Sequence, residues 1–264
     1  MTAFVALLLL TGFYPLVSAL RANRSTALRQ SLLWALPAWS AWLGVAISRV
    51  LRPEIEERMA AYMALCLTGC TGIAVLGARR PGASAWNFVV VGLLAVLLLP
   101  ILNGLGELRL EPAQKLFLIV TLAVPLLNYL PTRLATGAVF AAGGCGVEMV
   151  RILGWTSPAW LSSLLLSLAP WAAWMGLANR RRQLPGSSGE SEFDRLWLAY
   201  RDRFGFFWGQ RMREQFNRAA HHAGWPVVLH WSGLHPPTDS PEMLATLRAV
   251  LKRFGPEDEE QPKK

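Results

Sequence analysis

Four sulfur-bearing residues of one apolar run follow each other at intervals of four, three and four: Met59, Met63, Cys66 and Cys70. On a helix these intervals place the side chains along one stripe. Thioether and thiolate groups are the ligands that select Cu(I), so the stripe is a candidate copper path. Met and Cys also fill ordinary apolar cores, and packing is the alternative interpretation.

Glu148 is an acidic residue inside an apolar run. An ionisable group at membrane depth is costly and is therefore a functional candidate. Gly137, Ala141 and Gly144 precede it at helical spacing, and this small-residue face predicts that another helix packs there. Two interpretations stay open: a transport site, or structural pairing with Arg151 one turn later.

A short motif that occurs twice in the sequence gives a second candidate for a transport site. Pro100 precedes Asn103, and Pro125 precedes Asn128 at the same spacing. Proline frees a backbone carbonyl in the preceding turn, and interrupted helices at matching positions mark binding sites in some transporters. Both motifs lie near the end of a run, where Pro and Asn also act as stop signals.

Histidine is confined to the region after the last apolar run: His221, His222, His230 and His235. This placement disfavours an intramembrane bis-His haem, a rhomboid-like protease and a membrane-embedded metalloprotease, which need imidazole at membrane depth. The histidine spacing also matches no zinc motif. We therefore expect no cofactor and a non-enzymatic protein.

The elements that must position these residues are membrane-spanning helices. The chain is 53% hydrophobic and 16% charged, against about 25% charged in a soluble domain. A helix needs about 20 apolar residues to cross the bilayer. We predict an all-α membrane protein with a seven-helix transmembrane bundle over residues 1–179. The predicted spans cover about 3–20, 32–48, 59–76, 85–103, 116–130, 134–150 and 159–178.

Two features of this assignment have alternatives. The break between the fifth and sixth runs is only Pro131–Arg133, so a six-span count stays open. The first run contains Val17-Ser18-Ala19, which resembles a signal-peptide cleavage site. It lacks a basic start and contains Tyr14-Pro15, which favours a retained span.

Basic residues set the expected orientation and location. The loops between the predicted spans carry equal numbers of basic residues on the two sides of the membrane. Arg180–Arg182 and the basic tail give the C-terminal side the larger number. This bias predicts an outside N-terminus and a cytoplasmic C-terminus. Arg outnumbers Lys by 22 to 4, as in many GC-rich bacterial genomes, and we expect a bacterial inner membrane.

The tail is predicted to be a small helix–strand–helix unit. We expect a flexible linker over 180–191, an amphipathic helical domain over 192–255 and a disordered acidic end over 256–264. The first helix carries an aromatic and basic stripe that we expect to bind a protein partner, a second copy or the lipid surface: Trp197, Tyr200, Arg201, Phe204, Trp208 and Arg211. Interspersed acidic residues argue against nucleic acid.

The leading functional hypothesis is a non-enzymatic accessory or scaffold component of the membrane, whose tail binds a partner or lipid. A small transporter using Glu148, or using Asn103 and Asn128, is the first alternative. A copper-handling protein is the second. Composition and spacing do not decide among the three.

Overall fold

The computed structural model describes residues 2–51, 57–79, 83–103, 108–182, 191–238 and 240–254. The acidic end predicted over 256–264 lies outside the described residues, as does most of the predicted linker. The part of the linker that is described differs from the prediction. Helix α8 continues to Arg182, through residues expected to be flexible.

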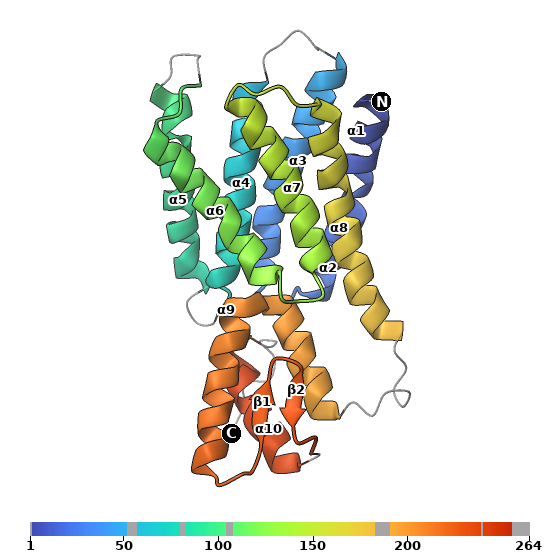
Figure 1. The fold of residues 1–264 in the computed structure, drawn as a ribbon, viewed down its shortest axis with the longest axis vertical. Coiled ribbons are helices and arrows are strands. Elements are labelled where there is room, and N and C mark those ends of the chain that lie inside the picture. The colour runs from blue at the N-terminus through green and yellow to red at the C-terminus, as the bar shows by residue number, and fades with distance from the viewer. Residues whose placement is uncertain are drawn as a thin grey trace, which may run out of the picture.

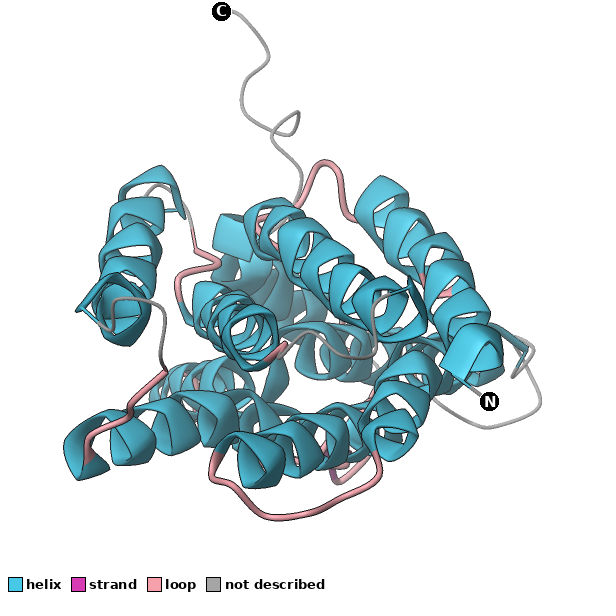
Figure 2. Ribbon diagram, turned by 90° about the horizontal axis from the view of Figure 1, so that it is seen from above, coloured by secondary structure: helices cyan, strands magenta, loops and turns pink. Residues whose placement is uncertain are grey.

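Within the described residues, eight helices form an elongated bundle. The N-terminus lies at the end of the bundle away from the tail (Figure 1). They are α1 (Thr2–Thr11), α2 (Phe13–Ala22), α3 (Arg29–Leu51), α4 (Arg58–Leu76), α5 (Ala83–Asn103), α6 (Pro112–Tyr129), α7 (Ala135–Ile152) and α8 (Ala159–Arg182). Viewed along the bundle, the described part of the structure consists almost entirely of helices (Figure 2).

Six segments of the described chain are long and apolar enough to cross a membrane: Ala3–Ala22, Arg29–Leu51, Arg58–Leu76, Ala85–Asn103, Pro112–Tyr129 and Ala159–Asn179. The first of these combines α1 and α2, which are separated at Gly12, where the Trp39 ring packs. The all-α membrane class therefore holds, with six candidate spans.

The predicted seven-span count is not confirmed, because α7 is not among these six segments. Glu148 and Arg151 lower its apolarity. It is nonetheless a bundle helix, separated from α6 by a turn in which Thr132 N donates to Tyr129 O. Its small-residue face lies against α8, since a Cβ on Gly144 would meet Leu166 and the carbonyl of Ser162.

The tail consists of α9 (Glu192–His222), β1 (Val228–His230), β2 (Gly233–His235), α10 (Pro241–Leu251) and a short 3-10 helix, η1 (Lys252–Phe254). The strands pair antiparallel with Leu229 opposite Leu234, so a hairpin replaces the single predicted extended segment. Gly205, with φ 79° and ψ −166°, divides α9 into two arms. The arms meet directly beneath the bundle (Figure 1).

The tail and the bundle share one apolar core. The buried aromatic residues of α9 cluster with Ala27, Leu28, Val75 and Ala78 at the adjoining end of the bundle. Trp208 Nε1 also donates a 3.2 Å hydrogen bond to the carbonyl of Val75. Removing this apolar aromatic surface from water stabilises the contact between tail and bundle.

Candidate functional site

A cluster of buried and partly buried charged side chains lies at the end of the bundle away from the tail. It contains Arg49 from the last turn of α3, Glu57 just before α4, and Glu148 and Arg151 from α7. Glu148 is 1% exposed and Arg49 is 8% exposed. The cluster ties together three segments that are far apart in the sequence.

Each carboxylate of the cluster lies between two guanidinium groups. Arg49 Nη2 is 3.0 Å from both carboxylate oxygens of Glu148, and Arg49 Nε donates to Glu57 Oε1. Arg151 Nη1 is 3.1 Å from Glu148 Oε2, and its Nη2 is 3.3 Å from Glu57 Oε1. Two cations and two anions alternate, so the cluster has no formal net charge. Such compensation is what makes buried charge tolerable.

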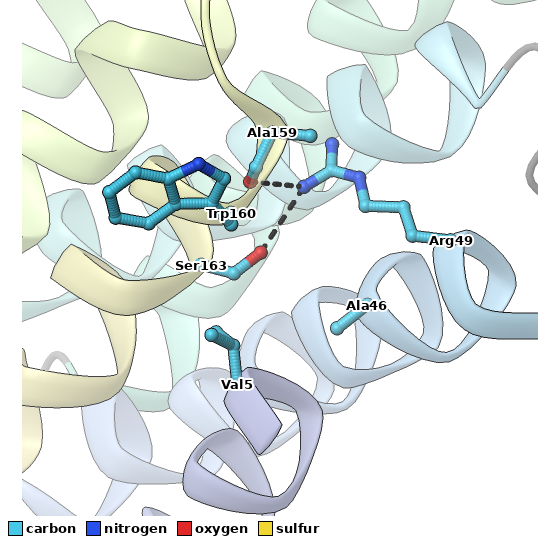
Figure 3. Close-up of a pocket in the computed structure, with 6 residues that line it drawn as sticks. All are labelled: Val5, Ala46, Arg49, Ala159, Trp160 and Ser163. Carbon is cyan, nitrogen blue, oxygen red and sulfur yellow. Dashed lines mark hydrogen bonds between the residues drawn. The ribbon is translucent and has the colours of Figure 1, made fainter. Parts of the chain in front are cut away.

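Two serines of α8 complete the cluster. Arg49 Nη1 donates to Ser163 Oγ at 3.2 Å and to the Ala159 carbonyl at 3.3 Å, as drawn in Figure 3. Ser162 Oγ donates to Glu148 Oε1. The donors of Arg49 are thus directed at protein acceptors. Chemically, the arrangement resembles a closed structural network more than a substrate-binding site.

The pocket beside Arg49 is small. It is lined by Val5, Ala46, Arg49, Ala159, Trp160 and Ser163 (Figure 3). It has room for about one water molecule, far below the several hundred Å³ of a typical ligand site. A water here would lie beside Arg49, and Glu148 is not among the residues that line this pocket.

The sulfur stripe of α4 runs from the surface of the bundle into its core. Met59 and Met63 are 37% and 42% exposed, whereas Cys66 and Cys70 are fully buried. Each thiol is 3.8 Å from a carbonyl oxygen of α5, Cys66 from Leu97 and Cys70 from Val90. Among the described residues, no group of three or more His, Cys, Asp or Glu could hold a metal ion. The copper path stays a prediction.

The two asparagines of the repeated Pro/Asn motif, Asn103 and Asn128, have different surroundings. Asn103 is exposed at the end of α5. Asn128 is 1% exposed and binds the backbone of α9: its Nδ2 donates to the Phe204 carbonyl at 3.3 Å, and its Oδ1 accepts from Phe207 N at 3.1 Å. The structure therefore does not bring the two into one site, and it gives Asn128 a role in docking the tail.

A second charged network lies at the junction of bundle and tail. Asp202 is fully buried and accepts from Arg201 at 2.8 Å, from Arg133 N at 3.4 Å, and pairs with Arg133 Nε at 3.8 Å. Arg201 Nη1 also donates to the Trp231 carbonyl at 2.8 Å. Trp231 Nε1 donates in turn to the Pro131 carbonyl at 2.7 Å. The α6–α7 turn is thus held by the tail.

The aromatic stripe of α9 forms the core of the tail. Exposure is 0% for Trp197, 5% for Tyr200, 3% for Phe204 and 9% for Trp208. Burial raises the pKa of the Tyr200 hydroxyl well above its usual value. Arg211 is exposed on this helix, with its guanidinium 5.7 Å from the Trp208 ring. The four aromatics are therefore packed inside the docked tail.

Several residues of these networks were missed by reasoning from sequence: Arg49, Glu57, Ser162, Ser163, Asp202 and Trp231. Arg49 was assigned to a loop because it follows the predicted second span. A usable signal was the Ser162-Ser163 pair inside an apolar run, since buried hydroxyls need partners. Comparison with protein-family models, with curated proteins and with solved structures gives no match for the chain.

Proposed function

We propose that the protein is a non-enzymatic scaffold or accessory component of a membrane assembly. Its bundle anchors the tail, and the outward surface of the tail binds a protein partner. The docked junction carries this proposal: Asn128, Asp202 and Trp231 join the tail to the bundle through hydrogen bonds and an ion pair. A domain held in this way presents a fixed surface, which suits assembly with other proteins.

The bundle itself supports a structural role. The charges of Arg49, Glu57, Glu148 and Arg151 neutralise one another within hydrogen-bonding distance. A transport site needs a polar group that a solute can reach, and Glu148 is 1% exposed. Among the described residues, the pocket beside Arg49 has room for about one water molecule and is not lined by Glu148.

The proposed location is a bacterial inner membrane, with the N-terminus outside and the tail in the cytoplasm. The end of the bundle next to the tail carries basic residues between α2 and α3, after α4 and before α7: Arg24, Arg79 and Arg133. At the other end, Arg49 and Arg151 belong to the charge cluster, and Arg58, Arg109 and Lys115 also lie near that end. The basic tail and Arg180–Arg182 therefore decide the proposed orientation. Basic residues in short loops favour the cytoplasmic side.

Co-purification of the full-length chain tests the scaffold role. The outward face of the second arm of α9 carries the exposed residues Arg211 and Arg218. We expect Arg211→Glu with Arg218→Glu to release a stoichiometric partner that the unaltered chain retains. Arg109→Glu, an exposed position before α6, is the matched control and should keep the partner. Purification without a partner, together with solute uptake into proteoliposomes, would overturn the proposal.

A further inference from the structure

Two histidines lie on the outward face of the β1–β2 hairpin. Leu229 and Leu234 are opposite each other and buried, so the residues that alternate with them point away from the core of the tail. His230 and His235 are two of these outward residues, and both are exposed. His230 is opposite Gly233, which is two residues before His235, so the two histidines are diagonal neighbours on one face.

The imidazole rings of His230 and His235 are close enough to bind one metal ion together. Their centroids are 5.9 Å apart, and their planes are at 84° to each other. A tetrahedral ion at about 2.0–2.1 Å from one nitrogen of each ring holds the two centroids about 5–6 Å apart. Among the described residues, no hydrogen bond or ion pair engages either ring. Exposed side chains also change rotamer rapidly, so each ring can turn a nitrogen toward a shared ion.

The hairpin that carries the two rings is fixed to α9 along both of its edges, and its strands lie beside the two arms of that helix (Figure 1). Asn217 makes two hydrogen bonds to β1: its Oδ1 accepts from Leu229 N at 2.7 Å, and its Nδ2 donates to the Leu229 carbonyl at 3.1 Å. Asp194 accepts from Leu234 N of β2 at 2.8 Å. A backbone held in this way keeps the two imidazoles near each other before an ion arrives, which lowers the entropic cost of binding.

A pair of imidazoles selects a particular class of ion. Imidazole is a ligand for Zn²⁺, Cu²⁺ and Ni²⁺, whereas Mg²⁺ and Ca²⁺ prefer oxygen ligands. In the part of the chain that the structure describes, no group of three or more His, Cys, Asp or Glu could hold a metal ion. A site at the hairpin therefore has two ligands from the protein, and it differs from the closed zinc motifs, which have four.

We propose that His230 and His235 form a surface site for a divalent transition-metal ion of the Zn²⁺ and Cu²⁺ class, with water in the remaining coordination positions. The site lies on the tail and is separate from the sulfur stripe of α4, whose two cysteines are buried in the bundle. This inference does not rest on the proposed scaffold role. The chain can bind the ion in the absence of a protein partner, and a partner can bind in the absence of the ion.

Calorimetric titration of the full-length chain with Zn²⁺ in detergent tests the site, at constant pH and with a purification tag that contains no histidine. His230→Asn and His235→Asn each remove one ligand. The double variant His221→Asn with His222→Asn is the matched control, because these rings are also exposed and are 6.0 Å apart. They belong to consecutive residues of α9, whose side chains diverge by about 100° around the helix. Thermal unfolding without metal verifies that each variant is folded.

We expect the affinity for Zn²⁺ to fall by about tenfold or more in each single variant, because the second imidazole acts as an intramolecular ligand. The control variant should keep the affinity of the unaltered chain, and Mg²⁺ should not compete. Electron paramagnetic resonance of bound Cu²⁺ should show two coordinating nitrogens in the unaltered chain and one in His235→Asn. The absence of saturable Zn²⁺ binding, an equal loss of affinity in the control variant, or a single nitrogen on Cu²⁺ in the unaltered chain would overturn the proposal.

Discussion

The side chain of Asn128 fills the space that a Cβ on Gly205 would need. One residue comes from the last turn of α6 and the other from the bend of α9. The amide of Asn128 binds the backbone on both sides of this bend, at Phe204 and Phe207. The bend and the docking of the tail are therefore one structural feature, which depends on both residues.

Asn128→Leu should loosen the tail from the bundle. The substitution leaves the Phe204 carbonyl and the Phe207 amide buried without this partner, at a cost of about 1–3 kcal/mol for each unsatisfied group. We expect faster hydrogen exchange across the bend of α9 and a lower unfolding temperature in detergent. Asn103→Leu is the control, since Asn103 is exposed. Equal exchange in the two variants would contradict the docking role of Asn128.

Gly205→Ala should destabilise the tail more than Gly224→Ala. Both glycines have positive φ, 79° and 68°, but no atom lies within 4 Å of the Cβ position at Gly224. The backbone of Gly205 lies in a region that is nearly exclusive to glycine, where another residue costs about 1–3 kcal/mol. The contact with Asn128 adds to that cost. Comparison of the two unfolding temperatures measures the difference, and a larger loss for Gly224→Ala would refute this account.

Local patterns in the sequence indicated the helices but not their partners. Apolar runs located the six candidate spans and also predicted a seventh over 134–150 that is not confirmed. The aromatic spacing along the tail predicted a long helix, which is seen as α9. The sequence could not show that Gly205 turns the chain back, because φ at a glycine is set by what packs against it. That neighbour, Asn128, lies in a different helix.

Helical spacing also failed to indicate burial along α4. Met59 and Cys70 are on one stripe by spacing, yet Met59 is 37% exposed and Cys70 is fully buried. Spacing gives the direction of a side chain around its helix, while burial also depends on how far along the helix its neighbours extend. Glu148 does pair with Arg151, as one of the two interpretations of the sequence expected, but its contact with Arg49 joins two distant helices and has no local signature.

Tyr200→Phe should leave the tail folded and make it less sensitive to alkaline pH. The Tyr200 hydroxyl is buried and has no hydrogen-bond partner among the described residues, so its removal should be neutral or stabilising. Burial raises the pKa of this hydroxyl in the folded protein. The stability that the neutral hydroxyl contributes is therefore fully present below its unfolded pKa of about 10, and it is lost as the pH rises toward the higher folded pKa.

The measurement for Tyr200→Phe is unfolding of the full-length chain in detergent at neutral pH and above pH ~10. The loss of stability between the two conditions should be smaller in the variant than in the unaltered chain. Tyr14→Phe, at an exposed position of α2, is the control and should leave that loss unchanged. An identical alkaline loss in Tyr200→Phe would contradict the role assigned to burial.

A double-mutant cycle on Arg49 and Glu148 tests whether the buried charges act as one structural unit. Among the described residues, Glu148→Leu alone leaves Arg49 and Arg151 with the carboxylate of Glu57. Removing one member of a buried ion pair costs about 3–5 kcal/mol. The combination with Arg49→Met leaves Arg151 and Glu57 as a balanced pair, so the double variant should be much less destabilised than the sum of the single variants.

Unfolding free energies in detergent give the coupling between the two substitutions. The exposed pair Glu214 and Arg218, 3.9 Å apart, is the control cycle, and its coupling should be about 0–1 kcal/mol. Additive effects of Arg49→Met and Glu148→Leu would mean that the two groups act separately. Stability unchanged by Glu148→Leu would show that Glu148 is not needed for the fold, and the case for a transport role of this residue would then be stronger.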